Sequence, residues 1–422
     1  MKIKSITDKL DIIVSELERK KIKDEMDVIV NALKDEIRRQ KVDADVFVGG
    51  SFAKGTIVNK KEHDVDIFVR FGWEYVNLSE KLDKIVKNAA RKLKLSYVCV
   101  HGSRDYFRIK KDLIYFEIIP VLRIKKPGEA RNVTDLSYFH VNYVIRKMNK
   151  NIAKEIAIAK TFCKAHGVYG AESYIQGFSG YGLECLIIYY KSFEKMLKAL
   201  IKVENRMVID PEKKYKNKDE VVINLNESKL HSPIVLVDPT WKERNVLAAL
   251  NIETFKKFQK SAKAFLKNPT IEFFKDKEID VDAMKKDAKK NNAEFVSIDL
   301  KTDKQAGDIA GTKLKKFSDF ISLEIGKYFT IIRKEFFYND IQSAKSYFVL
   351  KRKKDLTKIG PPVEMKDACK AFRKANKNTF EKNGMLHAKI VINHSAKRFL
   401  QQWKEKYAKK VKEMDITEID VN

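Results

Sequence analysis

The segment GGSFAKGTIVNKKEHDVDIFVRF, residues 49–71, constrains this chain more than any other stretch. Asp64 and Asp66 alternate with apolar residues in a pattern typical of a β-strand, whose alternate side chains point to one face. Two neighbouring carboxylates repel each other, and a hard divalent cation such as Mg²⁺ offsets that repulsion. The Gly-Ser turn upstream suits a loop whose backbone amides approach a phosphate closely. The segment therefore predicts a site for a metal-bound triphosphate, as nucleotidyl transfer requires.

A third carboxylate lies in the segment LIYFEIIPVL, where Glu117 interrupts an apolar strand. An ionised carboxylate in such surroundings is costly unless it is paired or bound to a metal. If this strand lies beside the strand of Asp64 and Asp66, the three carboxylates form one cluster. Such a cluster can hold two Mg²⁺ ions, which clamp the attacking and leaving oxygens of an in-line displacement. We therefore expect these three residues to be both catalytic and metal-ligating.

The composition restricts the class of protein and of partner. A chain of 422 residues is too long for one core, and about three domains are expected. The 86 Lys+Arg against 58 Asp+Glu give a net charge of +28, which predicts a polyanionic partner such as RNA. The 4 cysteines show no CxxC spacing, so neither a zinc ligand nor a disulfide framework is expected. Without a signal peptide or a long apolar run, we expect a soluble cytoplasmic protein with no membrane partner.

Hydrophobic periodicity predicts three regions of different character. In residues 1–143 the pattern indicates a mixed sheet backed by helices. The expected helices are two within residues 5–40 and one at 79–94. The expected strands lie at 44–48, 65–71 and 113–119, with a hairpin of 97–101 and 106–110. Residues 144–290 are predicted to be helical, with helices near 142–166, 177–201 and 238–267 and a loop at 204–233. Residues 291–422 alternate strands (295–300, 347–351, 386–392) with helices (312–328, 363–374, 395–412), which indicates an α+β module of ferredoxin-like or RNA-recognition type.

Several motifs resemble one family over most of the chain. GGSFAKGT, HDVDIFVRF and FEIIPV resemble the head domain of polymerase-β-type nucleotidyltransferases. YGAESYIQGFSGYGLECLIIYYKSF and DPTWKERNVLAALNIETFKKF resemble the archaeal-type (class I) CCA-adding enzymes, and KIGPPVEMKDACKAFRKAN and FEKNGMLHA continue the likeness into the tail. The resemblance implies a multidomain α+β protein with a polymerase-β-like head (1–143), a helical central domain (144–290) and a C-terminal body and tail (291–422).

The resemblance also implies a function and a set of binding residues. The family adds and repairs the 3′-terminal CCA of tRNA from CTP and ATP, without a nucleic-acid template and with Mg²⁺ as cofactor, two ions being expected. Its partners are tRNA, held at the acceptor stem and 3′ end, and the two nucleotides, with a homodimer left open. The family's nucleotide-binding positions correspond to Gly50, Ser51, Lys54, Ser137, His140, Lys160, Tyr169 and Arg244. Arg244 corresponds to the residue that reads the base, and Gly50 and Ser51 to the triphosphate cradle.

Two other readings compete with this interpretation. A poly(A)- or oligoadenylate-type nucleotidyltransferase would share the head, but the GFSGY and KERNV blocks disfavour it. A non-catalytic RNA-binding protein on the same scaffold is disfavoured because all three carboxylates are present. Glu117 itself departs from the family, because many members have an aspartate at this position, and residues 73–111 match the family poorly.

Overall fold

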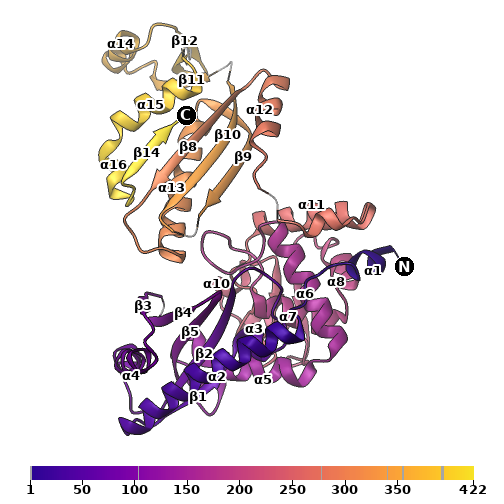
Figure 1. The fold of residues 1–422 in the computed structure, drawn as a ribbon. Helices are drawn as coiled ribbons and strands as arrows, with labels where there is room; N and C mark the ends of the chain where they lie inside the picture. Colours follow the sequence, from indigo (N-terminus) through magenta and orange to yellow (C-terminus); the bar gives the residue numbers. More distant parts are fainter. Residues whose placement is uncertain (1, 103, 277, 340, 354–355, 391–393) are drawn as a thin grey trace. The chain divides into compact units, whose positions relative to one another are not determined.

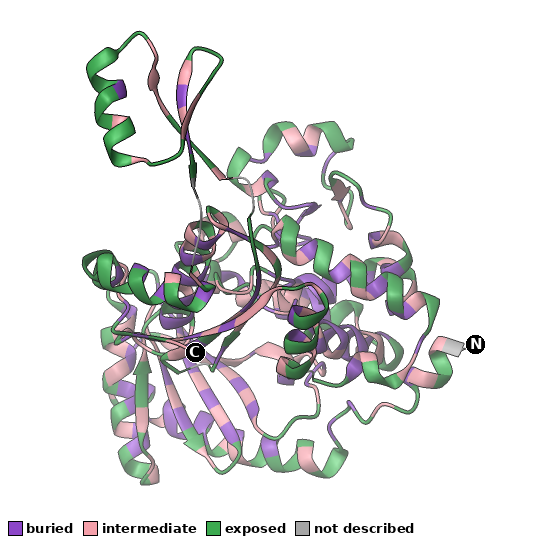
Figure 2. Ribbon diagram, turned by 90° about the horizontal axis from the view of Figure 1, so that it is seen from above, coloured by how far each residue is buried: buried purple, intermediate pink, exposed green. Residues whose placement is uncertain are grey.

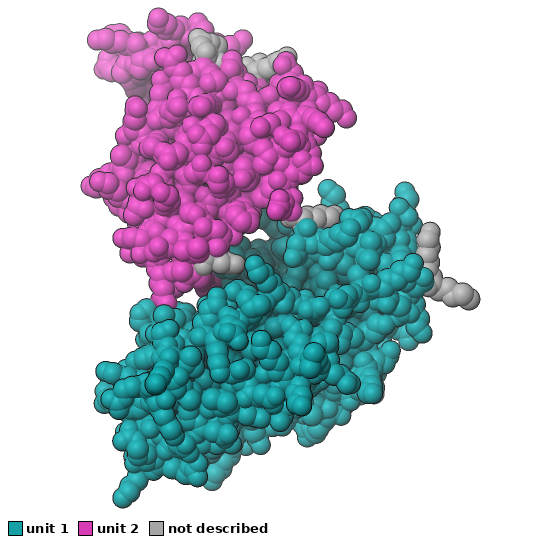
Figure 3. All heavy atoms as spheres, in the orientation of Figure 1, with its two compact units in different colours: residues 1–277 teal, residues 278–422 magenta. Residues whose placement is uncertain are grey.

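The computed structural model describes residues 2–102, 104–276, 278–339, 341–353, 356–390 and 394–422. The chain divides into two units, Met1–Lys277 and Glu278–Asn422 (Figure 3). The first unit contains the expected head and nearly all of the expected helical domain, and the boundary between them near residue 143 stays a prediction. No helix in the described ranges is long and apolar enough to cross a membrane.

A five-stranded sheet with the order β1-β2-β5-β4-β3 organises the start of the first unit (Figure 1). β2 and β5 run parallel, whereas the other neighbouring pairs are antiparallel. The apolar side chains of β2 and β5 share a core with α2 (Glu16–Arg39) and α4 (Leu78–Leu93). The polar residues that alternate with them along each strand therefore lie on the opposite face of the sheet. The expected strands and hairpin are confirmed as β1 (Ala44–Val48), β2 (His63–Phe71), β3 (Tyr97–Val100), β4 (Tyr106–Lys111) and β5 (Ile114–Leu122).

The helices predicted near the N-terminus have different limits. α1 spans only Lys2–Thr7, and α2 begins after a further eight residues that form no helix. In that segment Ile12 and Val14 are buried, whereas Ile13 is 53% exposed and forms a bridge with Val58. Burial therefore alternates with a period of two, and the helical spacing predicted there was wrong.

The rest of the first unit is mainly helical, as predicted, but its helices are shorter than predicted. The expected helix 142–166 is divided where Asn149 accepts a hydrogen bond from the backbone N–H of Ile152 and so begins a new helix. The expected helix 177–201 is divided at Lys191, which has a φ of 67°. The resulting helices pack their aromatic side chains into one core, and they are α5 (Ser137–Lys147), α6 (Lys150–Ala165), α7 (Gly180–Tyr190), α8 (Phe193–Leu200) and α11 (Ile252–Lys267).

The predicted loop at 204–233 has secondary structure of its own. β6 (Met207–Ile209) and β7 (Ile234–Leu236) pair in parallel, with α9 (Lys218–Asn224) and α10 (Glu227–Leu230) between them. The helix predicted from residue 238 begins only at Ile252, because the chain first folds back to pair Val237 with Asn245.

The second unit is α+β, as predicted. Its main sheet has the order β14-β8-β10-β9 and is antiparallel throughout, and a smaller sheet has the order β11-β13-β12. α14 is exposed along most of its length (Figure 2). Residues 391 and 392 of the expected strand 386–392 lie outside the described residues. The elements are α12 (Val281–Lys290), β8 (Glu294–Lys301), α13 (Asp308–Gly326), β9 (Phe329–Tyr338), β10 (Ser343–Arg352), β11 (Leu356–Pro362), α14 (Lys366–Ala375), β12 (Thr379–Lys382), β13 (Met385–Ile390), α15 (Ala396–Lys406), α16 (Ala408–Glu413) and β14 (Glu418–Val421).

The aromatic core of the first unit generates a stability prediction. Phe162 of α6 is fully buried and contacts the rings of Phe193 and Phe265 at centroid distances of 5.3 and 5.7 Å. We expect Phe162→Ala to lower the free energy of unfolding by about 3–5 kcal/mol, because it removes buried area and leaves a cavity. Urea unfolding followed by circular dichroism measures this loss. Ile223→Ala, at a side chain that is 82% exposed, should change stability by less than about 0.5 kcal/mol, and equal losses in the two variants would contradict the assigned core.

Candidate active site

The three predicted carboxylates lie on two adjacent strands. In β2 the apolar Val65 and Ile67 are buried on the helix-covered face, which leaves Asp64 and Asp66 on the other face. β5 runs parallel to β2, and Glu117 pairs in register with Asp66. The strand neighbourhood on which the predicted cluster depended is therefore confirmed.

Electrostatic repulsion is concentrated at this level of the sheet. Burial and the charges of Glu117 and Asp64 raise the pKa of Asp66 to about 6. Two cations neutralise part of this negative charge, because Asp64 Oδ2 lies 2.5 Å from Lys60 Nζ and Glu117 Oε1 lies 2.5 Å from Arg108 Nη2. Three carboxylates that share one face of two neighbouring strands supply the oxygen donors that Mg²⁺ prefers, and the residues therefore fit the metal that the resemblance implies.

The glycine at position 50 is required by the geometry next to Asp66. Gly50 begins the four-residue helix α3 (Gly50–Ala53) directly after β1, and its φ is +61°. A Cβ atom added to Gly50 would lie 1.6 Å from Asp66 Oδ2, so any other residue would displace that carboxylate. Gly50 thus brings its own backbone, and that of the adjacent Ser51, next to the carboxylate cluster.

Two of the predicted lysines meet at a carboxylate that the sequence analysis missed. Glu184 of α7 is fully buried, and its two oxygens accept hydrogen bonds from Lys54 Nζ at 2.6 Å and from Lys160 Nζ at 2.8 Å. Thr56 completes the group: its hydroxyl lies 3.0 Å from Glu184 Oε1 and 2.9 Å from Lys160 Nζ. We call Lys54, Thr56, Lys160 and Glu184 the lysine cluster. It joins the loop after β1 to α6 and α7.

The charge of Glu184 is fixed by the two lysines. Burial alone would raise the pKa of Glu184, but Lys160 and Lys54 lower it from 4.5 to about 2. A carboxylate whose pKa falls on folding stabilises the fold above its unfolded pKa, and this contribution disappears as the pH falls through about 2. Glu184 is therefore ionised at neutral pH. Burial lowers the pKa of Lys160 and Glu184 opposes that shift, and with both lysines protonated the lysine cluster carries a net positive charge. Both lysines also lower the pKa of Asp66, so their charges act on the carboxylate site.

His140 and Arg244 meet at a second buried carboxylate that the sequence analysis missed. Asp238 is fully buried, and Asp238 Oδ2 lies 3.0 Å from His140 Nε2 and 2.8 Å from Arg244 Nη1. Its other oxygen accepts hydrogen bonds from the Tyr181 hydroxyl at 3.2 Å and from Thr240. These contacts hold the pKa of Asp238 far below its usual range, although burial opposes them. We call Asp238, His140, Tyr181, Thr240 and Arg244 the Asp238 cluster.

Within the Asp238 cluster the imidazole is held between a ring and a charge. The rings of His140 and Tyr181 stack with centroids 4.0 Å apart. Burial lowers the pKa of His140 in spite of the neighbouring Asp238, which favours a neutral ring that donates its Nε2–H to the carboxylate. Arg244 keeps 22% of its side chain exposed, and Asp238 holds its guanidinium through Nη1.

The remaining predicted residues lie near these two clusters. Tyr169 is partly buried; the Lys164 Nζ atom lies 5.0 Å from its ring centroid, and its hydroxyl would lie 2.9 Å from a Cβ atom added to Gly180. Ser137 begins α5 one helical turn before His140, so the two residues share a face of that helix. Ser137 does not enter either cluster.

Comparison with known proteins matches two parts of the first unit. A family model described as a nucleotidyltransferase domain matches residues 30–126, and a model described as the second domain of tRNA nucleotidyltransferase matches residues 154–275. The first match covers the Gly-Ser turn and all three carboxylates, and the second covers Lys160, Tyr169, Glu184, Asp238 and Arg244.

Two individual relatives are consistent with these matches. A CCA-adding enzyme of Nanoarchaeum equitans is 41% identical over 211 residues, which are 50% of this chain and 52% of that protein. A CCA-adding enzyme of Saccharolobus shibatae is 34% identical over 244 residues, which are 57% of this chain and 55% of that protein. The matched part of the chain thus spans about half the length of these relatives.

The structural similarity concerns the fold alone. A structure of Cid1, a protein described as having RNA terminal uridylyl transferase activity, superposes with a TM-score of 0.50 at 13% identity and covers 64% of this chain and 95% of that one.

The resemblance predicted from the sequence motifs is confirmed by the family models and by the two CCA-adding relatives. Residues 30–126 are therefore similar to nucleotidyltransferase domains, and residues 154–275 are similar to the second domain of tRNA nucleotidyltransferases.

Proposed function

We propose that this protein adds and repairs the 3′-terminal CCA of tRNA, using CTP and ATP without a nucleic-acid template. The observation that carries the proposal is the match of residues 154–275 to the second domain of tRNA nucleotidyltransferase, directly after a nucleotidyltransferase domain. A head with three carboxylates suits nucleotidyl transfer to many substrates, whereas the match of the second domain favours tRNA as the substrate. The names of the most similar curated relatives favour the same substrate.

In this proposal, Asp64, Asp66 and Glu117 hold the Mg²⁺ ions that accompany the nucleotide. When bound, the metal lowers the pKa of the attacking 3′-hydroxyl and neutralises charge on the triphosphate. Metal binding would weaken the ion pairs of Lys60 with Asp64 and of Arg108 with Glu117, because each carboxylate would then share its negative charge with the metal. Gly50 and Ser51 would bring backbone N–H groups to the phosphates, and a side chain at Gly50 would displace the neighbouring carboxylate of Asp66.

The lysine cluster is assigned to the triphosphate. One carboxylate between two ammonium groups leaves one unit of positive charge, and Lys54 and Lys160 hold it where it acts on Asp66. Fixed charge in a buried, poorly hydrated site stabilises developing negative charge without reorganising at the moment of reaction. Glu184 is a positioning residue here, because it acts through the lysines. Tyr169, whose hydroxyl lies next to Gly180 at the start of α7, and Ser137 are assigned to the nucleotide as well.

The Asp238 cluster is assigned to the base. Asp238 holds one end of the Arg244 guanidinium and leaves other N–H groups for the acceptors of a base edge. Cytosine and adenine each present ring-nitrogen acceptors beside an exocyclic amino group, so a fork of donors beside a neutral His140 can serve both. Asp238 thus fixes the two side chains in one orientation.

The proposed RNA partner is tRNA, held chiefly through its phosphates. The net charge of +28 supplies the attraction, and an A-form acceptor helix is read by its shape and its 2′-hydroxyls. A cytoplasmic location and a homodimer remain parts of the proposal that rest on the resemblance.

The function is tested by supplying one radiolabelled nucleotide at a time. tRNA that ends before CCA should accept CTP but not ATP alone, tRNA that ends in CC should accept ATP, and complete tRNA should accept neither. Extension of every RNA by many adenylates or uridylates would instead assign a poly(A)- or uridylyl-type transferase. Binding of tRNA without incorporation of any nucleotide would assign a non-catalytic protein.

The metal-site assignment gives the first functional prediction. We expect Asp66→Asn, and likewise Asp64→Asn, to lower single-turnover addition by at least about 10²–10³-fold, the scale of losing one preorganised charge-stabilising group. Binding of tRNA in a filter assay should change little, because it depends on many phosphate contacts. Asp112→Asn makes the same charge change at an exposed turn between β4 and β5, where a φ of 53° suits asparagine. Activity of Asp66→Asn close to that of Asp112→Asn would refute the assignment.

The assignment of Arg244 to the base of the nucleotide gives the second functional prediction. Arg244→Ala should lose discrimination for CTP and ATP over UTP and GTP by about tenfold or more, since each unsatisfied polar group on a buried base costs about 1–3 kcal/mol. Single-turnover addition of all four nucleotides to both tRNA substrates measures the ratio. Arg206→Ala removes an exposed arginine of the same unit and should leave the ratio unchanged. A uniform slowing of all four nucleotides would make Arg244 a phosphate ligand instead.

A further inference from the structure

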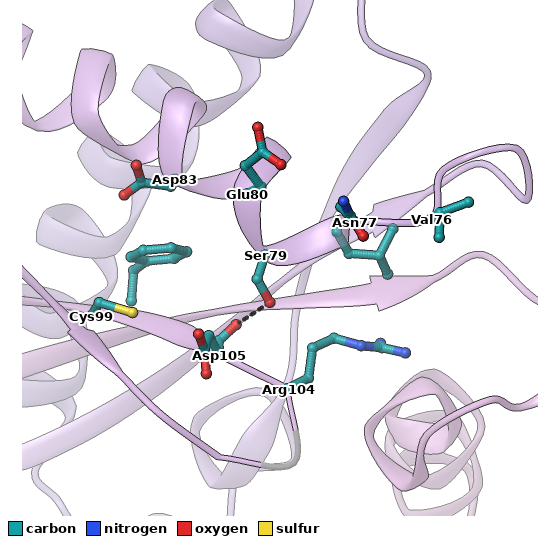
Figure 4. Close-up of a pocket in the computed structure, with 10 residues that line it drawn as sticks. Val76, Asn77, Ser79, Glu80, Asp83, Cys99, Arg104 and Asp105 are labelled. Atoms are coloured by element: carbon teal, nitrogen blue, oxygen red, sulfur yellow. Dashed lines mark hydrogen bonds between the residues drawn. The ribbon is translucent and has the colours of Figure 1, made fainter. Parts of the chain in front are cut away.

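A cavity of about 640 Å³ lies on the head domain away from both clusters described above. It is bounded by the start of α4 and by the β3–β4 hairpin, and its wall includes Asp83, Cys99 and Asp105 (Figure 4). The Ser79 hydroxyl donates a hydrogen bond of 3.0 Å to the backbone carbonyl of Asp105, which fixes the hairpin against α4. The motifs that carry the resemblance lie outside this stretch of chain, so the resemblance assigns its residues no role.

Three potential metal ligands of different chemistry meet at the edge of this cavity. The Cys99 sulfur, a His101 ring nitrogen and an Asp105 carboxylate oxygen all lie within 4.8 Å of one another. Among the described residues, this is the group of three or more His, Cys, Asp or Glu side chains whose ligand atoms lie so close together. His101 Nδ1 and Asp105 Oδ1 are 3.0 Å apart. Neighbouring ligands of a tetrahedral zinc ion are roughly 3.3–3.8 Å apart, so small side-chain rotations suffice to surround one.

The surroundings of the three side chains favour a cation. Cys99 is exposed, whereas Cys163, Cys185 and Cys369 are buried. The carboxylates of Asp83 and Asp105 line the same cavity as Cys99, so negative charge lies close to the thiol. Asp83 also accepts a hydrogen bond of 3.0 Å from the Tyr97 hydroxyl, so its carboxylate is held in place beside the group.

This group lies on the face of the sheet opposite to the carboxylate site. Cys99 pairs with Phe107 in the β3–β4 register, and Phe107 is buried on the α4 side. The next residue, Arg108, points the other way and pairs with Glu117. A metal bound at Cys99 would therefore be separate from the metals proposed for nucleotidyl transfer.

We propose that Cys99, His101 and Asp105 form a zinc site with three protein ligands, whose fourth position is open to water. Thiolate, imidazole and carboxylate together select Zn²⁺ over Mg²⁺, because sulfur and nitrogen are poor ligands for a hard cation. Binding displaces the thiol proton of Cys99 to solvent and leaves the sulfur as a thiolate ligand, with no change of oxidation state. The bound ion would fasten both strands of the hairpin at the edge of the sheet, and it would stabilise the folded state by binding it alone.

Cobalt(II) is the probe for this site, because a thiolate ligand gives Co²⁺ an intense charge-transfer absorption in the near ultraviolet that oxygen ligands do not give. The full-length protein is titrated with Co²⁺ in excess Mg²⁺, which occupies oxygen-only sites. We expect the absorption to saturate at one equivalent per chain and to be abolished by Zn²⁺. Addition of Zn²⁺ should also raise the melting temperature of the wild type.

Matched variants make the assignment specific. Cys99→Ser should lose the absorption and the rise in melting temperature, and His101→Asn and Asp105→Asn should each weaken Zn²⁺ affinity by at least about 10–100-fold. Cys369→Ser, at a buried thiol of the second unit, and Asp66→Asn, at the carboxylate site, should both keep the absorption. Absence of a charge-transfer band in the wild type, or an unchanged band in Cys99→Ser, would overturn the proposal.

Discussion

The ion pairs of Glu184 with Lys54 and Lys160 are the interaction on which the first unit most depends. Lys54 lies in the loop after β1, Lys160 in α6 and Glu184 in α7, so one carboxylate connects the sheet to the helices that face it. Burying three charges is expensive, and a buried pair often stabilises a fold no more than apolar residues would. A site that must present fixed positive charge to a triphosphate has no apolar substitute. The cost of burial is therefore linked to the proposed function.

The same arrangement appears twice around the proposed nucleotide site. A buried carboxylate orients cationic or polar side chains in the lysine cluster and again in the Asp238 cluster, whereas at Asp64, Asp66 and Glu117 the carboxylates face one another. The first two are satisfied within the protein. The third retains excess negative charge, as the raised pKa of Asp66 records. The carboxylate site carries excess negative charge and the lysine cluster carries excess positive charge. A metal-bound triphosphate would complement both, because its metal ions bind the carboxylates and its phosphates attract the lysines.

The sequence predicted the elements whose evidence is local. Strand alternation gave the common face of Asp64 and Asp66, and an apolar strand with one acid gave Glu117 as their neighbour. Gly50 was expected in a tight turn, although its collision with Asp66 could be seen only in three dimensions. The breaks at Asn149 and Lys191 were missed because apolar periodicity continues across them.

The residues that were missed are those whose partners are distant in sequence. Glu184 lies 130 residues from Lys54, and Asp238 lies 98 residues from His140. A single acid inside the apolar run GYGLECLIIYY was a usable signal for Glu184, since such a charge needs a partner. Cys99 is a different case, because His101 and Asp105 are close to it in sequence: no zinc ligand was expected there because the cysteines lack a CxxC spacing, whereas the zinc proposal rests on a hairpin that brings Cys, His and Asp together.

A double-mutant cycle on the lysine cluster tests the central claim most directly. Glu184→Gln leaves two buried ammonium groups without a countercharge, and we expect it to lower the free energy of unfolding by about 3–5 kcal/mol and to raise the KM for CTP and ATP. Glu194→Gln, at the surface of α8, should do neither. Adding Lys160→Met to Glu184→Gln should restore part of the lost stability, because one uncompensated charge is removed. Additive losses, within about 0.5 kcal/mol, would show that the two residues are independent and would contradict the account.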